Sequence, residues 1–237
     1  MSAFSILLLL AVVTGGCALS VVDVGTFSAA KNLPFENKDA FFACPPHFYG
    51  VFDGVSQCPQ SRAFAQTLAK GSCTRLQGAT PGGSMLEQVQ PVLWQALGEA
   101  QGFSGCSTAC LLRLDLQQEQ PQVSVYNLGD CTCMVLREVE GGAMEISGIS
   151  EEKLHSSGAP YQLGGEKWKT DRIEEAAMFA FDVAEGSIVL AFSDGISSNL
   201  EAAEICQIAS APQPAALLAR NLVEMARQRN KVQLFFI

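Results

Sequence analysis

Basic residues are scarce in this sequence: its 237 residues include 15 Lys and Arg against 24 Asp and Glu, giving a formal net charge of −9. Nucleic acids and anionic membranes attract clustered Lys and Arg, which this chain lacks, so neither is an expected partner. With 48% hydrophobic and only 16% charged residues, the chain is not a disordered or collagen-like protein. Its length favours one domain with a sizeable core, and the acidic excess leaves room for cation binding.

Cysteine motifs of metal sites are also missing. The nine cysteines form no CxxC pair, and no Cys and His residues have the spacing of a zinc site. Cys131 and Cys133 alternate on a predicted strand, so both should face the same side. We interpret most cysteines as small buried apolar residues. A disulfide framework stays open, because the spacing does not define one.

No apolar run reaches the roughly 20 residues that span a membrane. Residues 4–13 are apolar, small residues follow them, and residues 1–20 carry no charged side chain. This pattern predicts a signal or targeting segment at 1–20, cleaved after Ala18 or Ser20, and a single domain at 21–237 without a stable membrane span. The expected location is the secretory pathway, the exterior, or an organelle reached through that pathway. A buried N-terminal strand or an uncleaved anchor is the alternative.

Hydrophobic periodicity predicts an antiparallel α+β layered domain, which no internal repeat or linker divides. Residues 39–44 and 48–53 are expected to form a hairpin, and the polar segment 150–175 a surface loop or flap. Helices are predicted at 61–70, with Ser61 as N-cap and Gly71 as stop, and at 85–100, 200–208 and 214–228. Further strands are predicted at 107–114, 122–128, 133–139, 144–149, 179–181, 188–192 and 232–237.

Three aspartates stand at the ends of apolar strands: Asp39, Asp53 and Asp194. A strand end holds a side chain on a rigid scaffold, and the glycine after Asp53 and Asp194 permits a sharp turn and the close approach of an ion. Hard cations such as Mg²⁺ and Mn²⁺ prefer carboxylate, carbonyl and water oxygens. Each Asp-Gly pair is therefore a candidate metal position, although taken singly such a pair is more often an ordinary turn.

Seven strings extend this argument. They are NKDAFF, YGVFDGVS, SGCSTACLLRLD, VYNLGDCTCMVLRE, HSSGAPYQL, EGSIVLAFSDGISSN and RNKVQLFFI. In this order they resemble the metal-dependent PPM (PP2C-type) serine/threonine phosphatases, and above all the PTC7-like, SpoIIE-related branch. The resemblance covers residues 31–237. It implies a PP2C-like α-β-β-α sandwich of mainly antiparallel sheets flanked by helices, with a binuclear Mg²⁺ or Mn²⁺ centre.

The resemblance also implies site residues. Asp53 would bridge the two ions and the Gly54 carbonyl would join one, while Asp194 would bind the other. Asp39 would act through metal-bound water, and Asp130 matches a residue linked to a weaker third metal. In such centres a metal-activated water attacks phosphorus, so Asp53 and Asp194 would carry catalysis. The implied partner is a phosphorylated protein, and we expect a monomer.

Two further positions are candidates for substrate binding. Lys31 lies where the family often has a basic phosphate-contacting residue, and His155 matches a His of the PTC7-like branch. The alternatives are a solvated Lys and a surface-loop His without such a role.

Two departures from the family pattern affect the metal ligands. Lys38 replaces the Glu of the family's GEDA motif, and Asn230 falls on the first Asp of its terminal PDDV motif. An ammonium and an amide remove negative charge where a dication must be held, although Glu36 could take over from the lost Glu. The sequence therefore predicts a metal-dependent serine/threonine phosphatase. The alternative is a catalytically impaired pseudophosphatase that acts as a binding or regulatory module.

Overall fold

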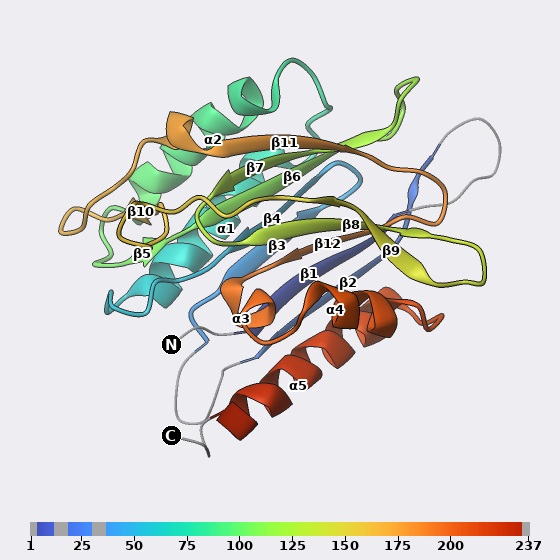
Figure 1. Ribbon diagram of the computed structural model, residues 1–237. Helices are drawn as coiled ribbons and strands as arrows, with labels where there is room; N and C mark the ends of the chain where they lie inside the picture. The colour runs from blue at the N-terminus through green and yellow to red at the C-terminus, as the bar shows by residue number, and fades with distance from the viewer. Residues whose placement is uncertain (1–3, 12–18, 30–36, 234–237) are drawn as a thin grey trace.

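Two five-stranded antiparallel sheets form the centre of the molecule, seen in a computed structural model that describes residues 4–11, 19–29 and 37–233 (Figure 1). The first sheet, ordered β11-β7-β6-β4-β3, contains β3 (Ala40–Cys44), β4 (Phe48–Phe52), β6 (Ala109–Asp115), β7 (Gln122–Leu128) and β11 (Ala177–Asp182). The second sheet, ordered β2-β1-β12-β8-β9, contains β1 (Phe4–Ala11), β2 (Val21–Ala29), β8 (Thr132–Glu138), β9 (Met144–Ile149) and β12 (Ile188–Phe192). A small ladder joins β5 (Cys106–Ser107) to β10 (Leu163–Gly164).

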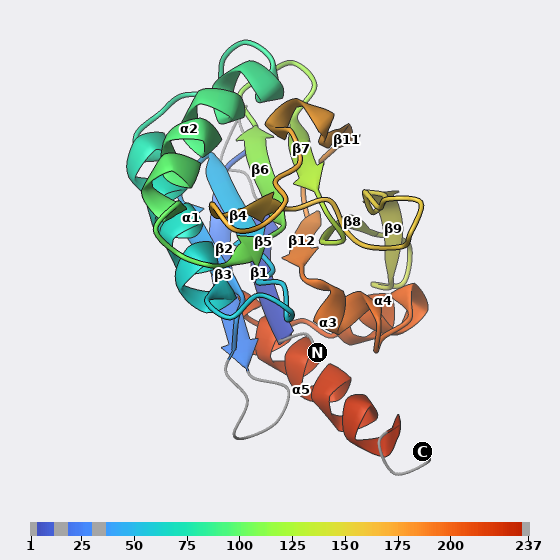
Figure 2. The same cartoon turned by 90° about the vertical axis from the view of Figure 1, so that its left-hand side faces the viewer.

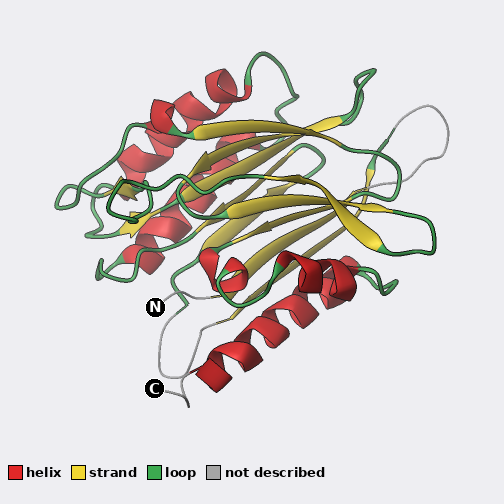
Figure 3. Ribbon diagram, in the orientation of Figure 1, coloured by secondary structure: helices red, strands yellow, loops and turns green. Residues whose placement is uncertain are grey.

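Helices cover the two outer faces of this sandwich (Figure 3). They are α1 (Ser61–Leu76) and α2 (Met85–Ala100) on the first sheet, and α3 (Asp194–Ser197), α4 (Ala202–Ala209) and α5 (Ala215–Gln233) on the second; a 3₁₀ turn spans Ile173–Glu175. Figure 2 shows the two helical layers on separate sides of the strands. The expected α-β-β-α sandwich of antiparallel sheets is confirmed.

Three apolar clusters correspond to the three interfaces between the layers. Phe64 and Leu93 pack with the first sheet, and Leu222 packs with the second. The third cluster lies between the sheets, where Val125 and Val189 are fully buried. Burial of apolar surface is the main force that holds such layers together.

Helix α1 is longer than predicted and passes through Gly71, which therefore does not stop it. A Cβ atom at Gly71 would lie 3.0 Å from the Cβ of Ala96, so this glycine allows α1 and α2 to approach closely. Ser61 is the first helical residue and not the N-cap. Its hydroxyl donates to the carbonyls of Val55 and Cys58, which ties the helix to the preceding loop.

The prediction of a C-terminal strand at 232–237 is wrong for Val232 and Gln233, because these two residues continue α5. Residues 234–237 lie outside the described residues. The helical periodicity of α5 continues beyond residue 228, where the sequence suggested a change of structure. On α2, the large apolar side chain of Trp94 is 53% exposed.

The N-terminal apolar run forms a strand within the second sheet. Residues Phe4–Ala11 pair with β2 on one side and β12 on the other, both antiparallel. This arrangement corresponds to the N-terminal strand named above as the alternative to a signal segment. The cleavage site predicted at Ala18 lies outside the described residues.

One disulfide joins β3 to α1 through Cys44 and Cys73. Cys131 and Cys133 are both buried in the cluster between the sheets, as expected of small apolar residues on one side of a strand. Among the described residues, none of the helices has the length and apolar character needed to cross a membrane.

Candidate metal centre

Asp39 and Asp53 lie side by side at the open end of the β3–β4 hairpin. Asp39 directly precedes β3 and Asp53 directly follows β4, and the first pair of the register is Ala40 with Phe52. Both aspartates are buried. The backbone of Asp53 is held by Thr108, whose amide donates to the Asp53 carbonyl at 2.9 Å and whose Oγ1 accepts from the Asp53 amide at 3.1 Å.

Asp130 and Asp194 reach the same place from the connection between the two sheets and from the second sheet. Asp130 lies in the turn between β7 and β8, and Asp194 begins α3 just after β12. Strands β8 and β12 pair with Thr132 opposite Phe192, which brings the two aspartates to one end of the sheet. The Ser193 hydroxyl donates to Asp39 Oδ2 at 2.9 Å and so links the two sheets at the site.

Two glycines permit the close backbone approaches that the site requires. A Cβ atom at Gly54 would lie 2.3 Å from the Lys38 carbonyl oxygen. Gly129 has φ +129°, and a Cβ atom there would lie 2.5 Å from the side chain of Thr108. Any larger residue at either position would displace a neighbour of Asp53 or Asp130.

The four aspartates influence one another electrostatically. Burial raises the pKa of Asp53 well above its ordinary value, and the charges of Asp39, Asp194 and Asp130 raise it further. Burial and the charge of Asp194 raise the pKa of Asp130 to about 7. Neighbouring carboxylates favour the protonated state unless a cation offsets their charge. The cluster is therefore suited to a bound cation.

The donors fit a hard divalent cation in kind. All are carboxylate oxygens, and within the described part of the chain Asp130 Oδ1 is buried without a hydrogen-bond partner. In that same part, no three His, Cys, Asp or Glu side chains are already arranged closely enough to hold one ion. To hold one ion, the carboxylates would have to move closer together. A bound cation would favour this movement because it offsets their mutual repulsion.

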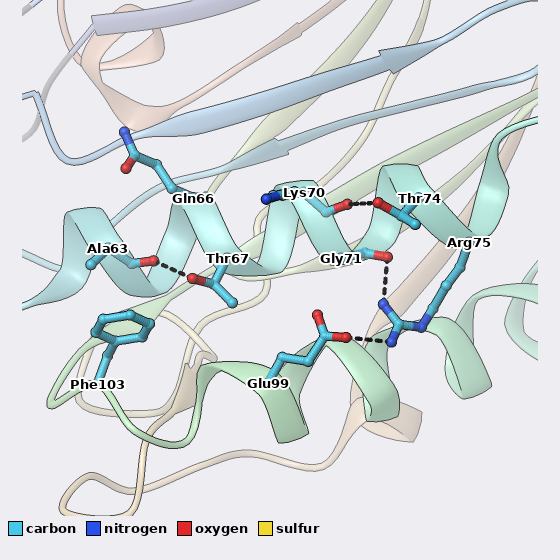
Figure 4. A pocket seen from close by; sticks show the side chains of 9 residues that line it. All are labelled: Ala63, Gln66, Thr67, Lys70, Gly71, Thr74, Arg75, Glu99 and Phe103. Carbon is cyan, nitrogen blue, oxygen red and sulfur yellow. Dashed lines mark hydrogen bonds and ion pairs between the residues drawn. The ribbon is translucent and has the colours of Figure 1, made fainter.

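Three of the four aspartates, all except Asp39, line a cavity of about 250 Å³. Its lining is Asp53, Val55, Ser56, Gln57, Thr108, Asp130, Pro160 and Asp194. A larger cavity of about 690 Å³ lies away from these aspartates, between α1 and α2 (Figure 4). There Arg75 donates to Glu99 and to the Gly71 carbonyl, so its charge is already compensated. We place the chemistry in the smaller, acidic cavity.

Lys38 turns its charge towards a loop. Its Nζ donates to the carbonyls of Ser56 at 3.0 Å and Cys58 at 3.3 Å. The lysine thus braces residues 54–58, which follow Asp53. Asn230 is buried in α5, where its Nδ2 donates to Asn199 Oδ1 at 3.3 Å.

His155 is engaged within the segment between β9 and β11. Its Nε2 lies 3.0 Å from Asp171 Oδ2, and its ring stacks on Tyr161 with centroids 3.9 Å apart. Pro160 of the same segment lines the acidic cavity. A substrate role for His155 stays a prediction. Lys31, and Glu36 with it, lie outside the described residues.

Two further residues, Thr108 and Ser193, support the centre and were not predicted from the sequence. Both hydroxyls lie inside strings already recognised, SGCSTACLL and AFSDG, and Ser193 directly precedes Asp194. Their contribution is to hold the aspartates through hydrogen bonds between distant segments, which no local pattern reveals.

Comparison with known proteins agrees with this geometry. No model of a protein family matches the chain. It is 31% identical over 170 residues to "Protein phosphatase PTC7 homolog fig" of Drosophila grimshawi, covering 67% of this chain and 53% of that protein. It is 29% identical over 201 residues to "Probable protein phosphatase 2C 80" of Arabidopsis thaliana, covering 81% of this chain and 45% of that protein. The chain thus spans about half the length of these relatives.

The chain is related to the PP2C-type phosphatases of the PTC7 branch. Solved structures agree on the PP2C fold. The photosystem II phosphatase PBCP has a TM-score of 0.63 and 23% identity, covering 81% of this chain and 73% of its own. The catalytic domain of the phosphatase PstP, solved with two manganese ions, has a TM-score of 0.62 and 14% identity, covering 95% and 94%.

Proposed function

We propose that this chain is a metal-dependent protein phosphatase that hydrolyses phosphoserine and phosphothreonine. The observation that carries the proposal is the convergence of four aspartates, three of which, Asp53, Asp130 and Asp194, line a cavity of about 250 Å³. A phosphoryl group carries about −1.5 to −2 charges at neutral pH. Carboxylates alone would repel it, so the site suits phosphate only when cations lie between them.

Asp53, the Gly54 carbonyl and Asp194 would hold two divalent cations, Mg²⁺ or Mn²⁺, with Asp39 and Asp130 in support. Such ions supply an activated water and offset the charge on the phosphoryl oxygens. The chain's own residues position these ligands. Thr108 fixes the backbone at Asp53 through two hydrogen bonds, and Ser193 orients Asp39.

The pseudophosphatase alternative rests on Lys38 and Asn230. The direction of the Lys38 side chain weakens it, since Nζ donates to the carbonyls of Ser56 and Cys58. A phosphatase is therefore the better-supported function.

The test is hydrolysis of p-nitrophenyl phosphate and of a phosphoserine peptide by the full chain, with and without Mn²⁺ or Mg²⁺. We expect metal-dependent turnover that Asp53→Asn lowers by about 10³-fold or more, because the centre acts as a unit. Asp182→Asn is the matched control, since Asp182 also ends a strand, β11, but is exposed.

Calorimetric titration with Mn²⁺ separates the two readings of a negative result. Tight Mn²⁺ binding without turnover would favour the binding module. If the native chain binds no Mn²⁺, or binds it no more tightly than Asp53→Asn does, the proposed centre itself is refuted.

A further inference from the structure

A third cavity, of about 370 Å³, lies beside the acidic one, between α3, α4 and the end of β9. We call it the α4 groove. Its apolar lining consists of Met134, Ile149, Phe192, Leu200, Ala202 and Ile205. The rest of the lining is polar or acidic and consists of Thr132, Ser150, Glu152, Ser197 and Glu201. Concave sites that combine apolar side chains with placed polar groups are typical binding sites.

Helix α3 separates the α4 groove from the candidate metal centre. Asp194, its first residue, lines the acidic cavity, and Ser197, its last, lines the groove. Three residues of helix rise about 4.5 Å, so the two cavities are immediate neighbours. Burial and the charge of Asp194 both raise the pKa of Glu152, another lining residue of the groove, which agrees with this closeness.

The charges around the α4 groove restrict its ligand. Glu152 and Glu201 line it, and both are exposed. A second phosphate or an acidic side chain would meet repulsion there. An apolar side chain would bury surface chiefly against the exposed Ile149 and the half-buried Ala202.

The position of β9 suits an extended peptide. In the strand order of the second sheet β9 stands at the edge, and Ile149 at its end is 46% exposed. An extended segment beside an edge strand presents alternate side chains to neighbouring pockets. A phosphoserine at the aspartates can thus place a nearby side chain in the groove.

We infer that the α4 groove binds an apolar side chain of the phosphoprotein substrate, close in sequence to the phosphorylated residue. This inference rests on the proposed phosphatase function and adds a substrate preference to it. Acidic residues at the same substrate position are disfavoured by Glu152 and Glu201.

The experiment uses phosphoserine peptides built on alanine, in which a single Leu or Asp replaces Ala at each position from four before to four after the phosphoserine. We expect Leu at one position to raise kcat/KM about tenfold over Ala, which is the scale of apolar pocket discrimination. Asp at that position should lower kcat/KM below the Ala value.

Ile149→Ser should bring the Leu-to-Ala ratio of kcat/KM at that position close to one. Ala202→Met fills the groove with a larger side chain and should also bring this ratio close to one. It replaces Ile149→Ser in the experiment if that variant folds poorly. Met178→Ser is the control, because Met178 is a similarly exposed strand residue (41%) on β11 that does not line the groove. Using the ratio cancels any general change in activity.

The outcomes separate this inference from the proposed function. Hydrolysis of p-nitrophenyl phosphate with equal rates for all peptides would overturn the groove and leave the phosphatase intact. If nothing is hydrolysed, fluorescence anisotropy of the same peptides still decides: Leu peptides should bind the native chain about tenfold more tightly than Ile149→Ser. Equal binding would overturn the inference.

Discussion

Asp39 and Asp53 come from the first sheet, Asp194 follows a strand of the second, and Asp130 lies in the turn that connects the two sheets, so the two sides of the candidate metal centre are assembled differently. In the first sheet, Asp39 and Asp53 flank a single hairpin, so a short stretch of chain places both. In the second, Asp194 follows β12, and β12 lies between β8 and β1, which comes from the opposite end of the chain. One half of the centre is thus local in sequence, and the other depends on long-range pairing.

This difference has an energetic consequence. Closing a hairpin costs little chain entropy, whereas bringing β1 to β12 orders a long loop before any contact compensates for it. The second half of the centre should therefore be easier to disrupt from a distance. The predictions below test this contrast.

The largest effect is expected from removal of residues 1–11. This deletion removes β1 from between β2 and β12. The strand pairs with β12 from Leu10 with Ile188 to Ile6 with Phe192, and its loss leaves β2 without its partner. We expect a loss of several kcal/mol, comparable with a small domain's whole stability of about 5–15 kcal/mol, and loss of turnover. Urea unfolding and limited proteolysis measure it.

Deletion of residues 1–3 is the control, since it spares β1. A chain lacking 1–11 that unfolds at the same urea concentration as the full chain would contradict the structural role of this strand. That result would instead agree with a removable targeting segment, and with the location expected from it.

Glycine substitutions compare the two halves directly. Gly54→Ala places a Cβ 2.3 Å from the Lys38 carbonyl, and Gly129→Ala adds an unfavourable positive φ to a 2.5 Å contact with Thr108. Each should cost about 2–3 kcal/mol of unfolding free energy by overpacking, and each should reduce turnover. Gly102→Ala, with no atom within 4 Å, should be nearly neutral. If Gly102→Ala loses as much unfolding free energy as Gly54→Ala, the close contact of Gly54 with the Lys38 carbonyl is not the cause of the loss.

A smaller effect is expected at Lys38 in the first half. Lys38→Met removes the hydrogen bonds to the carbonyls of Ser56 and Cys58 and should cost about 1–2 kcal/mol. Lys167→Met, at an exposed lysine, should change stability little. Mn²⁺ titration of both variants adds a second readout. A gain of Mn²⁺ affinity in Lys38→Met without loss of stability would show that the ammonium acts on the ion and does not brace the loop.

The same contrast explains what the sequence could predict. The β3–β4 hairpin and α2 carry strong local signals, and the structure confirms both nearly residue for residue. Helix α1 runs past its predicted stop because Gly71 serves helix packing, which only the tertiary contact with Ala96 reveals. The strand at Phe4–Ala11 resembles a signal segment because a continuous apolar run suits either role.

At the centre itself, motif order predicted Asp39, Asp53, Asp130 and Asp194 as metal ligands, and in the structure the other three lie close enough to Asp53 to raise its pKa. Local patterns could not give the direction of the Lys38 side chain, because its partners lie 18 and 20 residues away. The excess of acidic residues over the whole chain also gives no information on the direction of the Lys38 side chain.

The smallest expected effect concerns Asp171, in the segment that crosses from β9 to β11 and so joins the two sheets. Burial acts to raise the pKa of Asp171, but the Gln162 amide and His155 lower it more, and the net pKa lies below the ordinary value of 3.8. A carboxyl with a lowered folded-state pKa stabilises the fold above its ordinary pKa, and this contribution is lost as the pH falls through the lowered value.

Asp171→Asn should thus reduce the unfolding free energy at pH 7 by about 1 kcal/mol or less. The difference from the native chain should vanish towards pH ~2–3, as thermal unfolding across this range would show. Asp182→Asn, at an exposed position, provides the control. If the unfolding free energy of Asp171→Asn stays below that of the native chain by the same amount down to the lowest pH, then packing, and not the charge of Asp171, holds this segment against His155.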